Sequence, residues 1–459
     1  MPTVYNKVVA DNTTLIDLSQ DTVTQASHIV TGYVGHLADG TQVTGTGGGG
    51  GAPVTEKDVN FIDYDGTILY SYTAQEAAAL SAMPANPSHT GLTAQGWNYT
   101  LAQMKAEVTA QGKCTVGQMY TTSDGKTRIY ITIPAGTTGA GLTFYVRYTQ
   151  TVSQGVTVDW GDGNSETFTG TSATNRSHTY SAAGDYVITL NATSGSFSIV
   201  GSSSQAIYGS NSTYYNRTRI RKAEFGDNMT SIGNYAIFGC FALESVTIPK
   251  TVTSIGNNAF STCCALKSVT IPKDVTSIGT YVFNYCYALK SISIPSGVTS
   301  IGTYAFNYCY ALESVTIPQT VTSIGTYTFN TCYTLRSVTI PSGVTSIGAY
   351  AFYYCYALES VTIPSGVTSI ESYIFYGCCA LKSVTIPSGV TSIGSSAFAN
   401  CYALGEIHFK PSSPPSVGGS NAWSNIPAYC KIFVPTGKLS AYTSASNYPS
   451  STTYTYVEE

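Results

Sequence analysis

The sequence predicts a mainly β, multidomain protein whose C-terminal half is a solenoid of 23-residue repeats. Eight cysteines recur at this interval, at positions 240, 263, 286, 309, 332, 355, 378 and 401. Seven prolines keep the same interval, at 249, 272, 295, 318, 341, 364 and 387. Such a fixed period is typical of solenoids, in which each repeat buries its apolar side by stacking on its neighbours. Alternating apolar and polar residues over 127–200 add a β-sandwich before the solenoid.

Charge is scarce in this chain. Only 10% of its 459 residues are Asp, Glu, Lys or Arg, against roughly a quarter in typical soluble proteins. The surface must therefore be solvated by Ser, Thr, Asn and the hydroxyls of 36 tyrosines. A net charge of -4 with no basic run argues against nucleic acid and anionic membranes as partners. No stretch reaches 18 apolar residues and residues 1–18 lack a secretory pattern, so we expect neither membrane insertion nor a signal peptide.

The first units are short. Residues 1–46 form an N-terminal anchor segment, with a short helix expected at 23–30 and a hairpin at 31–45 around an Asp-Gly turn. An uninterrupted glycine run at 47–51 is a flexible linker. Residues 52–126 predict a small α+β module, because capping boxes at Thr73 and Thr100 each precede a helical run.

Residues 127–205 predict the sandwich, with strands at 128–133, 142–148, 156–160 and 186–190. The motifs Val158-Asp-Trp-Gly-Asp-Gly163, His178-Thr-Tyr180 and Gly184-Asp-Tyr-Val-Ile-Thr-Leu190 resemble the PKD-like immunoglobulin family. The resemblance implies an Ig-like spacer or interaction domain of seven strands, with no chemistry of its own.

The solenoid is expected over 206–410, followed by a C-terminal cap over 411–459. Each repeat reads Ile-Gly-x-x-Ala-Phe-x-x-Cys-x-x-Leu-x-Ser-Val-Thr-Ile-Pro-x-x-Val-Thr-Ser. Leu-x-x-Val-x-Ile predicts one strand per repeat, Pro ends it, and Ala-Phe-x-x-Cys predicts a short helical turn behind the sheet. Nine strands are expected, at 220–225, 243–248, 266–271, 289–294, 312–317, 335–340, 358–363, 381–386 and 404–409. The pattern resembles the BspA-like leucine-rich repeats, and the tail resembles that family's C-terminal cap.

No cofactor, metal site or catalytic constellation is expected. The in-phase cysteines lack Cys-x-x-Cys spacing and histidine companions, and they predict interior filling although stacked coils would permit disulfides. Cys264 and Cys379 fall in the following slot and are expected to be exposed thiols. Asp159, Asp162 and Glu166 could form a calcium loop, but a tight turn explains them more simply. We therefore expect a protein that is not an enzyme.

Differences among the repeats are confined to slots 3, 4, 5, 7, 8 and 10, counted from the Ile that opens each repeat. Tyrosine dominates these slots, and stacking predicts rows of tyrosines beside a Ser/Thr face. Antibody paratopes use a similar mixture, because tyrosine adds contact area with little entropy loss. The alternative is that an exposed turn tolerates any small or aromatic residue. The predicted ligand-binding residues are Tyr281, Tyr285, Tyr287, Tyr304, Tyr308, Tyr310, Tyr327, Tyr333, Tyr350, Tyr353, Tyr354, Tyr356, Tyr373 and Tyr376.

Two settings compete for such a protein. Residues 6–9, 14–18, 21–24 and 32–40 resemble the N-terminal segment of phage structural proteins, and 61–67 through 91–97 resemble a companion module. This resemblance implies a phage or prophage virion appendage, head- or tail-attached, that contacts other virion proteins through residues 1–46. Its solenoid would bind a host cell-surface protein or glycan. The alternative is a BspA-like bacterial cell-surface adhesin, and the missing signal pattern favours the virion. Oligomeric state is open, and a homo-oligomer would raise avidity.

Overall fold

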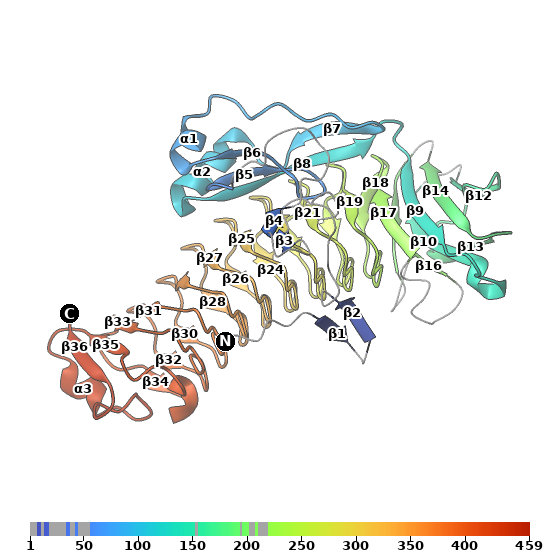
Figure 1. Cartoon of the computed structure of the whole chain (residues 1–459). Coiled ribbons are helices and arrows are strands. Elements are labelled where there is room, and N and C mark those ends of the chain that lie inside the picture. The colour runs from blue at the N-terminus through green and yellow to red at the C-terminus, as the bar shows by residue number, and fades with distance from the viewer. Residues whose placement is uncertain are drawn as a thin grey trace. The chain divides into compact units, whose positions relative to one another are not determined.

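The computed structural model describes residues 7–10, 13–17, 34–36, 42–44, 56–151, 155–192, 195–201, 207–209 and 219–459. The chain divides into two units, Met1–Thr55 and Glu56–Glu459 (Figure 1). The first unit contains two antiparallel pairs, β1 (Lys7–Ala10) with β2 (Thr13–Asp17) and β3 (Val34–His36) with β4 (Gln42–Thr44). The second pair confirms the hairpin expected at 31–45. The helix expected at 23–30 and the glycine linker at 47–51 lie outside the described residues.

The second unit starts with a small α+β module. Its sheet has the order β6-β5-β8-β7, formed by β5 (Val59–Ile62), β6 (Ile68–Tyr72), β7 (Leu92–Trp97) and β8 (Cys114–Thr122). Two helices accompany the sheet, α1 (Ala74–Ala79) and α2 (Leu101–Gln111). Both expected capping boxes form, Thr73 with Glu76 and Thr100 with Gln103. Among the described residues, no helix is long and apolar enough to cross a membrane.

The sandwich that follows has two antiparallel sheets. One contains β9 (Thr127–Ile133), β11 (Val156–Asp159), β12 (Ser165–Phe168) and β14 (Gly184–Ala192). The other contains β10 (Thr143–Gln150), β13 (Thr174–Thr179), β15 (Phe197–Ile199) and β16 (Ile207–Gly209), and a 3-10 turn (Gly139–Leu142) precedes it.

Both sandwich sheets continue into the solenoid. Strand β9 pairs antiparallel with β17 (Ile220–Glu224), the first strand of one solenoid sheet. Strand β15 pairs in parallel with β18 (Met229–Ile232), which begins the other solenoid sheet. The sandwich therefore covers the open N-terminal edges of the solenoid, and it is not a spacer packed separately from it.

Each solenoid coil has two strands, whereas the repeat pattern had suggested one. The expected strand forms at Ser-Val-Thr, and Thr-Ser-Ile supplies a second, shorter strand at the start of the next repeat. Both series pair in parallel between neighbouring coils, as Ser314 with Ser337 and Ser323 with Ser346. The Ser-Val-Thr strands after β17 are β19 (Ser245–Thr247), β21 (Ser268–Thr270), β23 (Ser291–Ser293), β25 (Ser314–Thr316), β27 (Ser337–Thr339), β29 (Ser360–Thr362), β31 (Ser383–Ile386) and β33 (Glu406–Phe409). The Ser-Ile strands after β18 are β20 (Ser254–Ile255), β22 (Ser277–Ile278), β24 (Ser300–Ile301), β26 (Ser323–Ile324), β28 (Ser346–Ile347), β30 (Ser369–Ile370), β32 (Ser392–Ile393) and β34 (Ser416–Val417).

The interior of the solenoid is a set of ladders. Phenylalanines of slot 6 stack from coil to coil, with Phe283 and Phe306 at 5.6 Å between ring centroids. The repeat cysteines are free and buried, which agrees with interior filling. Seven of them also donate their S–H to a backbone carbonyl of the preceding coil, as Cys309 Sγ does to Phe283 O at 3.2 Å. Cys264 and Cys379 are partly buried, whereas the sequence had suggested exposed thiols.

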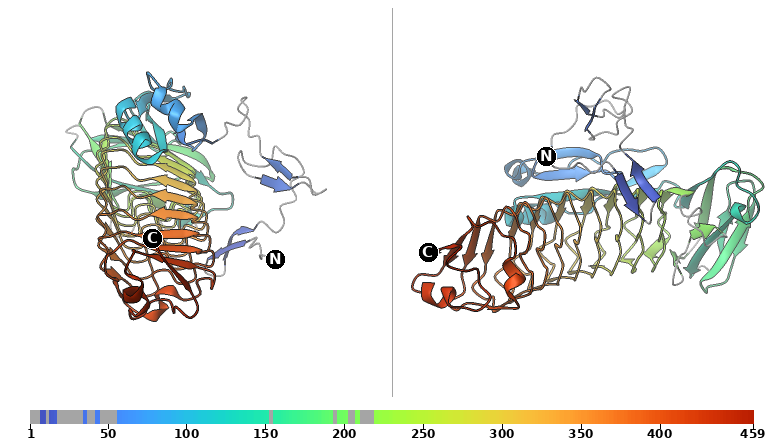
Figure 2. Two further views of the ribbon diagram at one scale, coloured as in Figure 1. Left: turned by 90° about the vertical axis from the view of Figure 1, so that its left-hand side faces the viewer. Right: turned by 60° about the horizontal axis from the view of Figure 1, so that its bottom comes forward.

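The C-terminal cap closes the opposite end of the solenoid (Figure 2). It adds β35 (Lys431–Val434) and β36 (Thr455–Glu458) to the Ser-Val-Thr sheet, together with α3 (Leu439–Thr443) and a 3-10 turn (Ser420–Trp423). Trp423 stacks on Phe398 at 5.2 Å and ends the phenylalanine ladder with a larger ring. The last coil is thereby shielded from water, as a repeat array requires.

The α+β module packs along the Ser/Thr face of the first coils. Asn98, fully buried, donates to Ile271 O and to Ser293 Oγ. Further along, Gln111 donates to Ile317 O at 2.7 Å and Lys113 to Ser337 Oγ at 2.9 Å. This face is therefore closed in the early coils and open at β29 and β31, whose serines and threonines are exposed.

Candidate binding site on the tyrosine face

The predicted site lies on the turn segment that joins each Ser-Ile strand to the next Ser-Val-Thr strand. This segment is a run of turns and does not form the helical turn that the sequence suggested. Slots 4 and 8 adopt left-handed backbone in every coil, as at Tyr281 (φ 59°) and Tyr285 (φ 60°). The left-handed residues in these two slots turn the backbone so that N–H groups of the segment point toward the next coil. Tyr281 N–H donates to Thr303 O, and Phe283 N–H donates to Ala305 O. The backbone of this face is thus fixed by neighbouring coils whatever the side chain.

Outward side chains of this segment form columns, which together we call the tyrosine face. The slot 4 column has ring centroids 4.4 to 4.7 Å apart and nearly parallel planes; its members are Tyr281, Tyr304, Tyr327, Tyr350 and Tyr373. The slot 10 column has spacings of 4.7 to 4.9 Å; its members are Tyr287, Tyr310, Tyr333 and Tyr356. Offset or stacked aromatic pairs of this kind stabilise each other by about 0.5–1.5 kcal/mol beyond their buried area.

The slot 8 column between them is interrupted. Tyr285 and Tyr308 stack at 4.8 Å, but the next coils have Thr331, Tyr354 and Gly377. In slot 7, Tyr353 and Tyr376 stack at 5.0 Å in the later coils. The structure therefore places all fourteen predicted tyrosines on one face.

Earlier coils have an asparagine ladder in slot 7. Asn307 Nδ2 donates to Asn284 Oδ1 at 2.7 Å, and Asn330 Nδ2 donates to Asn307 Oδ1 at 2.6 Å. Asn330 is 6% exposed. The ladder ends there because slot 7 of the next coil is Tyr353. Sequence reasoning missed these asparagines, although their recurrence at 23 residues beside the tyrosines was a usable signal.

Several hydroxyls of the tyrosine face have a pKa above that of an ordinary tyrosine and therefore stay protonated at physiological pH. Burial, with the neighbouring Tyr287 and Tyr333, raises the pKa of Tyr310. Burial and stacked neighbours likewise raise the pKa of Tyr304, Tyr327 and Tyr350. The face therefore offers aromatic rings and uncharged hydroxyls that both donate and accept hydrogen bonds.

A hollow of about 330 Å³ interrupts the tyrosine face at Thr331. Its floor is Thr331 with Asn330, both nearly inaccessible to solvent. The lining tyrosines are Tyr308, Tyr327, Tyr333, Tyr350, Tyr353 and Tyr354. We call it the Thr331 hollow. The sequence had not singled out Thr331, although a threonine breaks the run of tyrosines in its slot.

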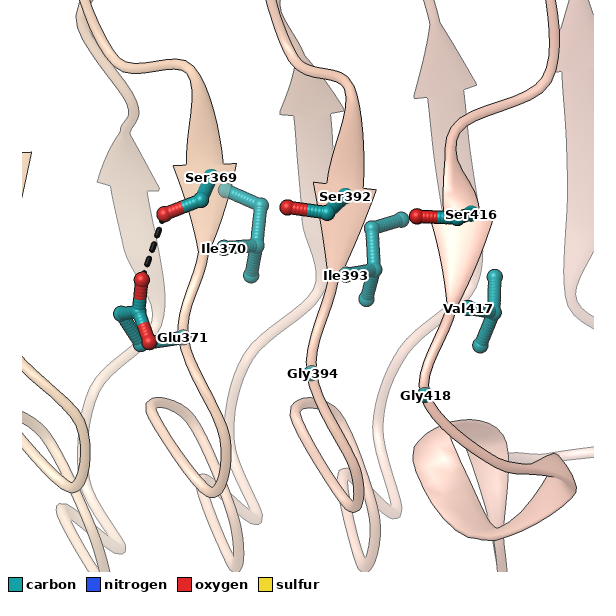
Figure 3. A pocket seen from close by; sticks show the side chains of 9 residues that line it. All are labelled: Ser369, Ile370, Glu371, Ser392, Ile393, Gly394, Ser416, Val417 and Gly418. Carbon is teal, nitrogen blue, oxygen red and sulfur yellow. Dashed lines mark hydrogen bonds between the residues drawn. The ribbon is translucent and has the colours of Figure 1, made fainter.

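A second hollow, of about 270 Å³, lies on the Ser-Ile sheet (Figure 3). Ser369, Ser392 and Ser416 line it from β30, β32 and β34. Glu371, which occupies a slot that is glycine in the other repeats, accepts a hydrogen bond from Ser369 there (Figure 3). Its one carboxylate is already hydrogen-bonded to Ser369, so this hollow offers a ligand fewer contacts than the tyrosine face does.

The aspartates of the acidic loop in the sandwich already accept hydrogen bonds from backbone N–H groups of their own turn. Asp159 accepts the N–H of Gly161, and Asp162 accepts the N–H of Asn164. The other oxygen of Asp162 lies 2.7 Å from His178 Nε2. Among the described residues, no group of three or more His, Cys, Asp and Glu side chains could hold a metal ion.

Known proteins resemble the repeats. The family model of the BspA type leucine rich repeat region (6 copies) matches residues 209–336 and 299–425. A leucine-rich repeat protein of T. pallidum is 32% identical over 33% of this chain and 72% of its own, with a TM-score of 0.32. A leucine-rich cell surface protein of Faecalibacterium prausnitzii A2-165 is 28% identical over 49% and 81%, with a TM-score of 0.28. A leucine-rich repeat protein of Eubacterium ventriosum is 25% identical over 57% and 80%, with a TM-score of 0.35. No curated protein matches this chain.

Proposed function

Because this chain belongs, through its repeats, to the BspA-type leucine-rich repeat family, we propose that it is a non-enzymatic binding protein whose tyrosine face holds a ligand at a bacterial cell surface. The ligand is a cell-surface glycan or protein. The solenoid is the scaffold, and the outward slots supply the contacts.

The observation that carries this proposal is the choice of tyrosine at left-handed positions. A non-glycine residue in this conformation costs about 1–2 kcal/mol. The same slots accept residues that tolerate it better, namely Gly239, Asn258, Gly377 and Asn400. Tyrosine nevertheless fills slot 4 in five consecutive coils, from Tyr281 to Tyr373. Tyrosines held in a costly backbone conformation and gathered on one face support a role in contact with a partner.

The part of the solenoid surface that the α+β module leaves uncovered also favours the tyrosine face as the binding site. The module covers the Ser/Thr face of the first coils through Asn98, Gln111 and Lys113. Contiguous exposed aromatic surface usually marks an interaction site. Tyr333 and Tyr356 are among the most exposed large apolar side chains of the described residues, at 36% and 42%.

Cell-surface display agrees with the description of the F. prausnitzii relative, which is a cell surface protein. A second setting, the virion, rests on the resemblance of residues 6–9, 14–18 and 32–40 to phage structural proteins. There, residues 1–46 would contact other virion proteins. Immunoelectron microscopy with an antibody to residues 220–410 separates the two: label on envelopes supports the surface protein, and label on virions supports the appendage.

The binding role is tested by removing the slot 4 rings. The triple variant Tyr304→Gly, Tyr327→Gly and Tyr350→Gly retains the left-handed backbone. Labelled protein is applied to a panel of bacterial cells and immobilised cell-surface glycans. We expect wild-type protein to bind at least one target and the triple variant to bind it at least 10-fold more weakly.

The matched control removes exposed apolar surface from the cap, by Tyr429→Ser with Leu439→Ser, and should bind as wild type. Equal binding by the triple variant, or no binding by the wild type to any target, would overturn the proposal.

A further inference from the structure

We propose that the Thr331 hollow is the primary subsite of the tyrosine face and takes one neutral pyranose ring of a glycan. This inference rests on the proposed binding function and specifies the ligand class within it.

The hollow lies where the slot 8 column has a threonine in place of a tyrosine ring. Tyr285 and Tyr308 stack at 4.8 Å with planes 15° apart, so one face of Tyr308 is covered. The next position in the column would cover its other face, but Thr331 ends at a methyl and a hydroxyl. The column resumes with Tyr354 one coil later. A flat ring that enters here replaces the absent side chain and stacks on Tyr308.

Gly377 leaves room for the ring of Tyr354, which borders the hollow. A Cβ at Gly377 would lie 2.4 Å from Cδ1 of Tyr354, so the ring of Tyr354 occupies space that any larger residue would need. Tyr354 is also edge-on to Tyr376, with planes 70° apart, and does not stack as Tyr308 does. The ring of Tyr354 therefore lies against Gly377 of the next coil.

The floor offers a hydrogen-bond acceptor. Asn330 Oδ1 accepts the hydroxyl of Thr331 at 2.9 Å, where an earlier member of the ladder accepts an asparagine amide instead. An amide oxygen has two lone pairs, so a second donor can be accommodated. A ligand hydroxyl that reaches this depth would complete the ladder that Tyr353 interrupts.

The residues that line the Thr331 hollow indicate which chemical class of ligand it can bind. The lining consists of tyrosine, asparagine and threonine, with no ionisable group other than phenols. Burial raises the pKa of Tyr327, Tyr333, Tyr350 and Tyr353, which keeps these phenols neutral. A charged ligand would lose its hydration with no counter-charge. A pyranose supplies both required features, a flat C–H face for Tyr308 and hydroxyls for the floor. A phenyl ring supplies only the first, because it has no hydroxyl to donate to the second lone pair of Asn330 Oδ1.

The test fills the hollow. Thr331→Tyr restores the ring in slot 8, which three other coils have at the same backbone angle. Thr262→Tyr is the matched control, because Thr262 occupies the same slot with φ of 64° in an earlier coil. The probe is an array of neutral hexose and N-acetylhexosamine oligosaccharides with sialylated counterparts. Thermal unfolding of each variant confirms the fold.

We expect wild type and Thr262→Tyr to bind a neutral oligosaccharide, and Thr331→Tyr to lose at least 10-fold. Gly377→Ala, which forces the ring of Tyr354 at the edge of the hollow to move, should also weaken binding. If Thr331→Tyr binds as wild type while the slot 4 triple variant does not, the subsite is wrong and the tyrosine face stands. Preference for sialylated sugars, or displacement of the bound target by N-acetyltyrosinamide and not by free hexoses, would overturn the neutral pyranose.

Discussion

Tyr281 and Phe283 lie two residues apart on one turn segment, and their rings face opposite sides of it. Tyr281 stacks on Tyr304 at the surface, and Phe283 stacks on Phe306 in the interior. The ring centroids are 4.6 Å apart in the outer pair and 5.6 Å apart in the inner pair, and only the inner pair is fully buried. The inner column therefore stabilises the solenoid, and the outer column is free to contact a ligand.

This difference predicts opposite responses to ring removal. Phe306→Ala should destabilise the protein by about 3–5 kcal/mol, because it leaves a cavity in a closely packed interior. Tyr304→Gly should change the free energy of unfolding by less than about 1 kcal/mol, because lost stacking is offset by relief of the left-handed conformation. Urea unfolding followed by circular dichroism measures both. A large loss for Tyr304→Gly would mean that the tyrosine column is structural.

The interior position of the fixed apolar slots could be predicted from the sequence, but not every changing slot is exterior. Slot 5 changes and is buried, as at Val282 and Thr328, and slot 7 is buried where it is asparagine, as at Asn307. The backbone of the changing slots could not be predicted. Tyrosine at position 281 does not indicate a positive φ, which arises from hydrogen bonds to the next coil. The residue types that favour this conformation are Asn258 in slot 4 and Gly239, Gly377 and Asn400 in slot 8, and they are too few to reveal it.

Contacts between the α+β module and the solenoid could not be predicted from the sequence either. Asn98 in the module and Ser293 in the solenoid are 195 residues apart and form a buried hydrogen bond. Asn98 breaks no local pattern, and Ser293, which replaces the threonine of the other Ser-Val-Thr strands, does not indicate by itself what it contacts. The second strand of each coil was missed for a different reason, because Ser-Ile is too short for an alternation to be recognised.

The docking of the module predicts a sensitive position at Asn98. Asn98→Leu keeps the approximate size but leaves the Ile271 carbonyl and the Gly117 amide without this partner. A buried group left unpaired costs about 1–3 kcal/mol, so we expect a loss of about 2 kcal/mol or more. Hydrogen exchange in β7 and β8 should accelerate. Gln95→Leu is the control, since its contacts to Asp227 and Lys250 are exposed and water can replace them. Equal protection in the two variants would contradict the docking.

The buried thiols predict a loss of stability at alkaline pH. Burial raises the pKa of Cys355 from 9.0 to about 12. Between these values the unfolded chain releases protons that the folded chain retains, so the free energy of unfolding falls as pH rises. Below about pH 8 both states keep the proton and the thiol has no effect. Urea midpoints at pH 7.5, 9 and 10.5 measure the slope. Cys355→Ala should reduce the slope, and a midpoint independent of pH would show that the thiols are not buried.

The shared sheets predict that the solenoid does not stand without the sandwich. A fragment of residues 206–459 would expose the edges of β17 and β18, which β9 and β15 otherwise cover. The buried Ile220 and Ala223, which pair with Ile131 and Ile129 of β9, would lose these neighbours. Open strand edges beside apolar side chains promote association, so we expect this fragment to elute as aggregates in size-exclusion chromatography. The fragment 127–459 differs only in keeping the sandwich and should remain dispersed. If both fragments behave alike, the N-terminal edge of the solenoid needs no cover and the sandwich is a spacer after all.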